Sequence, residues 1–185
     1  MDQNTECYEL CHPLLTNTQK HPNDYIKILK DIASYNFEFF PYKYLNENLI
    51  VIINPYNGPL DDEDSINNYN KYIDLLHKNN SKIIGYVSTN YGNNSLTSVK
   101  TDIDLWASKY NIDGIFLDET SSDNDKFSYY SELENYINSK NKSLIVNNFG
   151  TIPHTSYKSL KSIKIILETS YQEAKTEITS ENYKN

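Results

Sequence analysis

The chain has 185 residues, enough for one domain with its own hydrophobic core. Its formal net charge at pH 7 is -8 and its basic residues, all lysines, form no cluster, so we expect neither a nucleic-acid partner nor an anionic membrane partner. No apolar run approaches the roughly 20 residues that a membrane-spanning helix needs. The first residues also lack the charged and apolar regions of a signal peptide, and the sequence leaves the compartment open.

Two cysteines, Cys7 and Cys11, lie near the N-terminus beside His12. A Cys-x3-Cys pair could supply half of a zinc site, but no second pair of ligands follows at a suitable spacing. We therefore expect no metal and no cofactor. The two thiols are either reduced or joined in a short-range disulfide.

The N-terminal part of the chain differs in pattern from the rest. Residues 1–22 show no clear periodicity, so we expect a poorly ordered arm there and a single domain over 23–185. Apolar residues at helical spacing predict a helix over 24–35, with Asn23 as its N-cap. The aromatic run at 37–40 favours a short strand.

From residue 49 onward, mainly apolar strands alternate with amphipathic helices. The strands are predicted at 49–53, 82–87, 112–119, 144–148 and 163–168. Helical segments are predicted at 62–79, 96–110, 125–138 and 157–160, and a final amphipathic segment covers 171–179. The helical residues expected to face the core are Ile66, Tyr69, Ile73, Leu76, Val99, Ile103, Trp106, Ala107, Phe127, Tyr130, Leu133 and Ile137. Strand, polar turn and helix repeating about every 30 residues is typical of βαβ units with parallel strands.

This repeat favours an α/β fold, either a doubly wound sheet or a (β/α)8 barrel. No glycine-rich phosphate-binding loop follows any strand, so the nucleotide-binding version has no support. A complete (β/α)8 barrel needs about 250 residues. We therefore predict a TIM-barrel-like fold that is incomplete, with about five or six of the eight strand–helix units.

Polar residues stand at the end of each predicted strand. Because the carboxyl ends of parallel strands meet at one edge, we expect these residues to share a site. They are Asn54, Tyr86, Thr89, Tyr91, Asp118, Glu119, Asn148 and Glu168. Carboxylates for acid–base work, amides for hydroxyl groups and tyrosine rings for pyranose faces together indicate a sugar site.

The adjacent carboxylates Asp118 and Glu119 pose a geometric question. Neighbouring side chains of a regular strand point to opposite faces, so either one of them lies behind the site or the strand breaks there. Glycoside hydrolysis needs two carboxylates about 5 to 5.5 Å apart in retaining enzymes and about 6.5 to 9.5 Å apart in inverting ones. Other strand-end residues also have purely structural alternatives. Asn54 and Asn148 could form turns, Tyr86 could pack in the core, and Glu168 could cap the helix that follows it.

Four segments stand in one order along the chain, followed by the apolar strand that ends in Glu168. They are Ile-Asn-Pro-Tyr-Asn-Gly-Pro at 53–59, Gly-Tyr-Val-Ser-Thr-Asn-Tyr-Gly at 85–92, Gly-Ile-Phe-Leu-Asp-Glu at 114–119 and Asn-Phe-Gly-Thr at 148–151. Together they resemble the spherulin-4-like, or spherulation-specific, family over residues 49–171. The resemblance implies a (β/α)8 fold, and some relatives are glycoside hydrolases that cleave α-1,4-linked galactosamine or N-acetylgalactosamine polymers of microbial exopolysaccharide.

The resemblance also implies roles for three carboxylates. Asp118 is the candidate nucleophile or stabiliser of an oxocarbenium-like state, Glu168 the candidate general acid/base, and Glu119 the reserve for either role. The family supplies two more strand–helix units after Glu168, so we expect a partner or self-association to cover an open barrel edge. Its members are often secreted or found at the cell surface.

We therefore predict an endo-acting glycosidase that cleaves α-linked galactosamine or N-acetylgalactosamine polysaccharide by a carboxylate-pair mechanism. The alternatives are a non-catalytic carbohydrate-binding or cell-surface protein and an inactive, truncated member of the family. A separation below about 10 Å between Glu168 and either Asp118 or Glu119 would make hydrolysis feasible.

Overall fold

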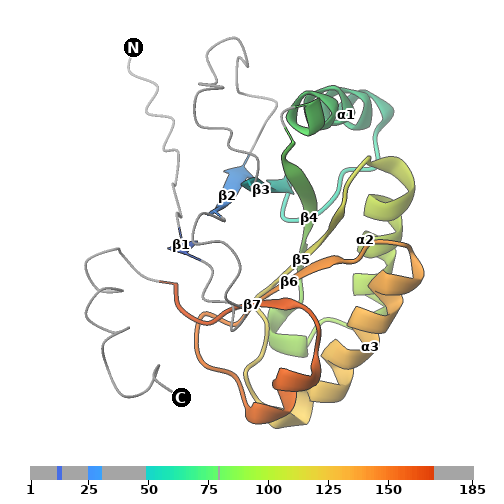
Figure 1. Cartoon of the computed structure of the whole chain (residues 1–185). Coiled ribbons are helices and arrows are strands. Elements are labelled where there is room, and N and C mark those ends of the chain that lie inside the picture. The colour runs from blue at the N-terminus through green and yellow to red at the C-terminus, as the bar shows by residue number, and fades with distance from the viewer. Residues whose placement is uncertain (1–11, 14–24, 31–48, 79, 169–185) are drawn as a thin grey trace, which may run out of the picture.

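The computed structural model describes residues 12–13, 25–30, 49–78 and 80–168 (Figure 1). Their strands form one sheet in the order β1-β2-β3-β4-β5-β6-β7. The strands are β1 (His12–Pro13), β2 (Tyr25–Lys30), β3 (Leu49–Asn54), β4 (Lys82–Ser88), β5 (Gly114–Asp118), β6 (Leu144–Asn148) and β7 (Ile163–Ile165). β1 pairs antiparallel with β2, and every later neighbour is parallel.

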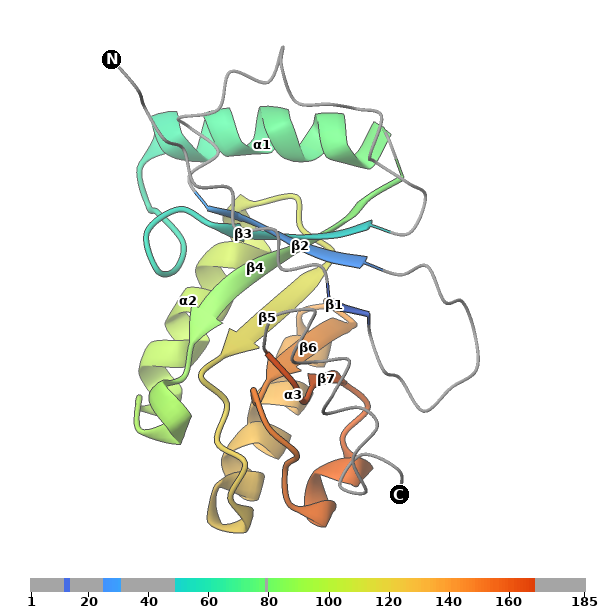
Figure 2. The ribbon, with the colours of Figure 1, turned by 90° about the vertical axis from the view of Figure 1, so that its left-hand side faces the viewer.

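Three helices connect these strands and cover one face of the sheet, as Figures 1 and 2 show from two sides. They are α1 (Glu63–Lys78), α2 (Leu96–Lys109) and α3 (Phe127–Ser139), with short 3-10 helices η4 (Asn90–Gly92), η5 (Asn124–Lys126) and η6 (Thr155–Ser159). The predicted α/β class with parallel strands is therefore confirmed. Within the described residues the sheet is open.

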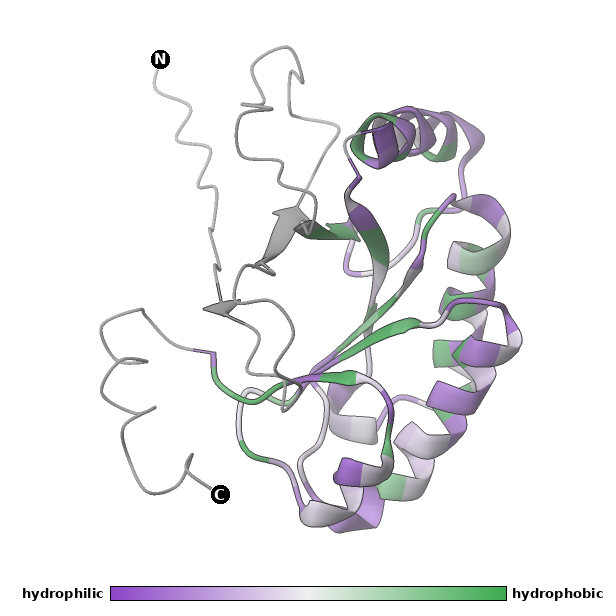
Figure 3. Ribbon diagram, in the orientation of Figure 1, coloured by the Kyte–Doolittle hydropathy of each residue, from purple (hydrophilic) through white to green (hydrophobic). Residues whose placement is uncertain are grey.

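Both faces of the sheet are buried, which explains why its strands are apolar without alternation. The face toward the helices carries Val51, Ile53, Ile83, Val87, Ile115, Leu117 and Ile145. The opposite face carries a second apolar cluster of Ile50, Ile52, Ile84, Tyr86, Phe116 and Val146. Figure 3 shows these strands as mainly hydrophobic, whereas the outer sides of the helices are hydrophilic.

The helices pack as their sequence periodicity predicts. The predicted core residues are buried at Ile66, Tyr69, Ile73, Leu76, Val99, Ile103, Trp106, Tyr130, Leu133 and Ile137. Trp106 lies wholly inside, and its Nε1 donates a hydrogen bond to the carbonyl oxygen of Tyr86 at 2.9 Å. α2 begins where the Ser95 hydroxyl accepts the Ser98 N–H, which caps its N-terminus.

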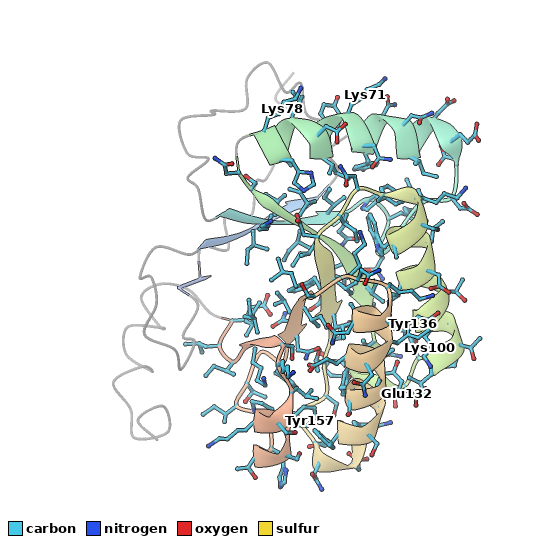
Figure 4. All side chains as sticks on the ribbon, turned by 45° about the vertical axis from the view of Figure 1, so that its right-hand side comes forward. Lys71, Lys78, Lys100, Glu132, Tyr136 and Tyr157 are labelled. Carbon is cyan, nitrogen blue, oxygen red and sulfur yellow. The ribbon has the colours of Figure 1, made fainter. Side chains whose placement is uncertain are left out.

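The outer sides of α2 and α3 are joined around one tyrosine ring (Figure 4). The ammonium groups of Lys100 and Lys140 lie 4.9 and 4.5 Å from the centre of the Tyr136 ring. Lys100 also pairs with Glu132 at 2.6 Å, and the Tyr136 hydroxyl donates to Asp104. This network fastens the two helices on the side away from the sheet.

The helix predicted over 24–35 is wrong, because Tyr25–Lys30 forms β2. This segment pairs with β3 along its whole length, from Tyr25 opposite Leu49 to Lys30 opposite Asn54. The hydrogen bonds of that ladder and the β-branched isoleucines favour the strand over a weak local helix preference. The strand expected at 37–40, the segment at 171–179 and the N-terminal arm except β1 lie outside the described residues.

Gly85 allows β4 to approach α2 closely. A Cβ atom added at Gly85 would meet the indole ring of the buried Trp106. We expect Gly85→Ala to lower the free energy of unfolding by about 1 to 3 kcal/mol, because the core must shift to admit the methyl group. Urea unfolding would measure this loss. Thr97→Ala, on the exposed side of α2, is the control and should change stability by less than about 0.5 kcal/mol; an equal effect of both variants would contradict the packing argument.

At the amino edge of the sheet, Asp113 fastens β4, β5 and α1 together. Its Oδ2 accepts from the Ile83 N–H at 2.7 Å and lies 2.9 Å from His77 Nε2, while Lys82 Nζ lies 3.3 Å from Oδ1. Burial by itself raises the pKa of Asp113. The Ile83 N–H, His77 and Lys82 outweigh burial and hold this pKa below its usual value.

This lowered pKa makes stability depend on pH. A group whose pKa is depressed by folding stabilises the protein above its unfolded value of about 3.9 and loses that contribution as the pH falls through the folded value. We expect Asp113→Asn to cost about 1 to 2 kcal/mol at neutral pH, and the difference from wild type to shrink in acid. Urea unfolding from about pH 7 to about pH 3 tests this. A pH-independent difference, or the same behaviour in the exposed control Asp61→Asn, would contradict the assignment.

Candidate active site

The candidate site lies at the carboxyl edge of the sheet. β4 and β5 end on the same side of the molecule, where the chain leaves them for α2 and α3 (Figure 2). Their pairing sets Ser88 opposite Asp118, and Asn148 ends the neighbouring strand β6. Tyr86, Asp118 and Asn148 belong to the sheet face that carries no helix, since they alternate with residues that pack on the helices.

Asp118 is held by two hydrogen bonds. Its Oδ2 accepts from the Tyr86 hydroxyl at 2.7 Å, and its Oδ1 accepts from the Asn148 amide at 2.9 Å. Burial raises the pKa of Tyr86, and the bond to Asp118 and the charges of Asp118, Glu119 and Glu168 raise it further. The Tyr86 phenol therefore stays protonated at neutral pH and donates to the carboxylate.

Asn148 joins Asp118 to Glu168. The same Nδ2 atom donates to Glu168 Oε2 at 3.0 Å, so the two carboxylate oxygens lie no more than about 6 Å apart. The opposite amide orientation would turn the Asn148 oxygen toward two carboxylates, so the hydrogen-bond network fixes this one. Glu168 is exposed, whereas Asp118 is partly buried.

Glu119 reaches the site because the strand breaks there. β5 ends at Asp118, and Glu119 has a φ of 50°, in the left-handed region that residues other than glycine rarely adopt. Its Oε2 accepts from the Ser88 hydroxyl at 2.6 Å. Of the two alternatives left by the sequence, the broken strand is the one found. Ser88 was missed, although alternation along β4 from Tyr86 puts it on the site's side of the sheet.

Thr89 holds this turn from the helix side of the sheet. Its Oγ1 contacts the carbonyl oxygens of Asp118 and Glu119 at 2.9 and 2.8 Å and the Tyr130 hydroxyl at 2.9 Å. Tyr130 also accepts the Ser121 N–H at 2.8 Å. The sequence predicts a substrate contact for Thr89, but this side chain is fully buried and points toward the helices. We therefore assign Thr89 to positioning the carboxylates.

Asn54 and Tyr91 occupy the loops after β3 and β4. Asn54 is buried, and its Oδ1 accepts the Gly58 N–H at 3.1 Å, which is the turn-forming alternative considered for it. The Tyr91 side chain is 55% exposed. Its backbone N–H donates to the carbonyl oxygen of Glu119 at 2.7 Å, so the loop that carries Tyr91 is attached to the carboxylate turn.

A buried carboxylate, for which no sequence pattern predicts a role, positions the chain that leads into β7 and on to Glu168. Glu134 on α3 is 8% exposed, and it accepts the backbone N–H groups of Lys161 and Ser162 at 2.8 and 3.2 Å. The Asn147 amide donates to the Ser162 hydroxyl at 2.7 Å. These bonds secure the turn between η6 and β7.

The described residues offer no group of three or more His, Cys, Asp or Glu side chains that could hold a metal ion. In the same part of the chain, no helix has the length and apolar character to cross a membrane.

The fold and the site place this protein in the class of α/β proteins that carry paired carboxylates at the carboxyl edge of a parallel sheet. The chain belongs to the spherulation-specific family 4, whose model matches residues 41–185. The predicted family is thus confirmed. The chain is 40% identical over 124 residues to Spherulin-4 of Physarum polycephalum; this match covers 65% of the chain and 36% of Spherulin-4, so the chain spans about a third of that relative's length.

A solved structure shows the same fold. Sph3 of Aspergillus clavatus, crystallised in complex with GalNAc, superposes with a TM-score of 0.61 at 24% sequence identity. The match covers 69% of this chain and 56% of Sph3. Strands and helices follow the same α/β arrangement in both proteins.

The left-handed backbone at Glu119 predicts an unusual order of stability among variants. Glu119→Gly and Glu119→Ala both remove the bond to Ser88, but only glycine adopts this conformation without strain. We expect the Gly variant to be more stable than the Ala variant by about 1 kcal/mol in urea unfolding. The matched pair Thr97→Gly and Thr97→Ala in α2 should show the reverse order. An Ala variant as stable as the Gly variant at 119 would contradict the strained turn.

Proposed function

We propose that this protein is a glycoside hydrolase that cleaves α-linked galactosamine or N-acetylgalactosamine polysaccharide, with Asp118 and Glu168 as its carboxylate pair. One observation carries the proposal: the Asn148 amide bonds a carboxylate oxygen of each residue. The likeness to a structure that holds GalNAc supports a sugar as the ligand class.

The spacing favours a retaining mechanism. The two hydrogens of a planar amide nitrogen diverge by about 120°, which sets oxygens at these bond lengths about 5 Å apart. Retaining glycosidases separate their carboxyl groups by about 5 to 5.5 Å, whereas inverting enzymes need room for a water between them. A single bridging nitrogen leaves no such room.

The two steps then follow from position. Glu168, the exposed member, donates a proton to the glycosidic oxygen while Asp118 attacks the anomeric carbon, which breaks the glycosidic bond and forms a glycosyl ester. Glu168 next takes a proton from water, and this water attacks the anomeric carbon and releases Asp118. Asp118 keeps lone pairs for attack while Tyr86 and Asn148 fix its orientation. Glu119, held by Ser88, is the reserve for either role.

Two further parts of the prediction remain proposals. Tyr91 is the proposed substrate contact among the strand-end residues, because it is at the carboxyl edge and exposed. Asn148, expected from the sequence to contact substrate, gives both amide hydrogens to the two carboxylates and its Oδ1 is buried, so we propose that it positions them. The sequential order of the parallel strands β2 to β7, with helices on one face, supports an arc of a (β/α)8 barrel. β7 pairs with β6 alone among the described strands, and a further strand, a partner or a second copy would cover its other edge.

Hydrolysis can be tested by measuring reducing ends released from an α-1,4-linked galactosaminogalactan polymer. We expect wild type to release them and Asp118→Asn and Glu168→Gln each to lose more than about 100-fold in rate, because each removes one half of the carboxylate pair. Glu132→Gln is the control: this carboxylate lies on the outer side of α3, and the variant should keep full activity (Figure 4).

The outcomes separate the alternatives. A folded wild type that binds the polymer without releasing reducing ends would support a non-catalytic carbohydrate-binding protein. Wild type that neither binds nor cleaves would contradict the proposed substrate class. Activity that survives Glu168→Gln would remove Glu168 from the mechanism.

A further inference from the structure

The large apolar side chains exposed on the described part of the chain all lie in loops at the carboxyl edge. Tyr56 is 82% exposed after β3, Tyr91 is 55% exposed after β4, and Ile152 is 45% exposed after β6. None of these three lies on α1, α2 or α3 or at the amino edge, so their exposure is confined to the edge that carries the carboxylates.

Folding does not account for the two tyrosines. A ring as exposed as Tyr56 removes little apolar surface from water and so contributes little to stability. Tyr91 also has a φ of 55°, a left-handed conformation that costs a residue other than glycine about 1 kcal/mol or more. Exposure without packing, in one case with backbone strain, indicates a surface that contacts something else.

Both rings are carried by loops that are fixed to the sheet. The buried Asn54 accepts the Gly58 N–H and so closes the loop on which Tyr56 stands. The Tyr91 N–H donates to the carbonyl oxygen of Glu119, next to the carboxylate that approaches the site. Rings held on fixed loops lose little freedom when a ligand stacks on them, which favours binding.

The strand order puts the rings in a line with the carboxylates. β3, β4 and β5 are consecutive neighbours, so a path along the carboxyl edge meets Tyr56, then Tyr91, then Asp118 and Glu119. Neighbouring strands of a sheet lie about 4.8 Å apart, so the loops that carry the two rings follow one another along this edge. Tyrosine presents an apolar face for the C–H surface of a pyranose and a hydroxyl for its polar groups.

We propose that Tyr56 and Tyr91 are two successive subsites for sugar residues of the polymer on the β3 side of the cleaved bond, Tyr91 near it and Tyr56 one unit further away. This inference rests on the proposed function and adds to it a requirement for a long chain. Tyr56 then sets the length of oligosaccharide at which binding becomes tight, which suits an enzyme that cuts within a polymer.

The test measures binding of α-1,4-linked N-acetylgalactosamine oligosaccharides of two to seven units by calorimetry, in Glu168→Gln so that the ligand survives. Neutral, N-acetylated oligosaccharides avoid a general attraction between cationic sugars and a chain of net charge -8. The Glu168→Gln protein is the parent of this series. Relative to it, adding Tyr56→Ala should lower the affinity for the longest oligosaccharides about five- to tenfold and leave the affinity for the shortest unchanged. Tyr91→Ala should weaken short and long ligands alike, whereas Tyr56→Phe, which keeps the ring, should bind as the parent does.

Failure of this inference can be told from failure of the proposed function. If the parent gains affinity with length and Tyr56→Ala gains it equally, the Tyr56 subsite is wrong while the sugar site stands. If the parent and the wild-type protein bind no oligosaccharide of any length, the substrate class and the subsites fall together. Lys71→Ala, on the outer side of α1, is the control and should match the parent at every length (Figure 4).

Discussion

The candidate site depends on one buried hydroxyl group. The Tyr130 hydroxyl accepts the Ser121 N–H and bonds Thr89 Oγ1; Tyr130 is the donor of this second bond, because Thr89 has one proton and the carbonyl oxygens beside it can only accept. The Thr89 proton is then left for the carbonyl oxygens of Asp118 and Glu119, which it holds at the point where β5 ends. Because this chain of donors sits under the turn and out of water, it fixes the left-handed backbone that brings two consecutive carboxylates to one side of the sheet.

The fold could be predicted from the sequence wherever a secondary-structure element is determined by its own local residue pattern. Strands β3 to β6 each have an apolar run that ends in polar residues, so composition alone locates them, and α1 follows from its helical spacing. Tyr25–Lys30 was mispredicted because its strand state comes from pairing with Leu49–Asn54, a contact that no local pattern records. The closure of a barrel is likewise non-local: the described strands make an open sheet, and the chain covers about a third of Spherulin-4.

The members of the site were predictable, but their arrangement was not. Position at the strand ends was enough to select Asp118, Asn148 and Glu168, since parallel strands bring their carboxyl ends together. The backbone geometry determines which face of the sheet each side chain occupies. For Glu119 this is the left-handed backbone that ends β5. Thr89 differs from its prediction for the same reason, because it follows Ser88 directly and so points to the opposite side.

Strands β4 and β5 separate stability from function along their length. At the amino edge, Asp113 is bonded to Ile83, His77 and Lys82 and joins both strands to α1. The carboxyl edge of the same strands collects positive φ values at Glu119 and Tyr91. Strain of this kind persists only where the surrounding structure determines it. The hydrogen bonds of Asp113 at the amino edge and the buried faces between hold the two strands in register, and this register keeps the strained turns at Glu119 and Tyr91 in a single arrangement.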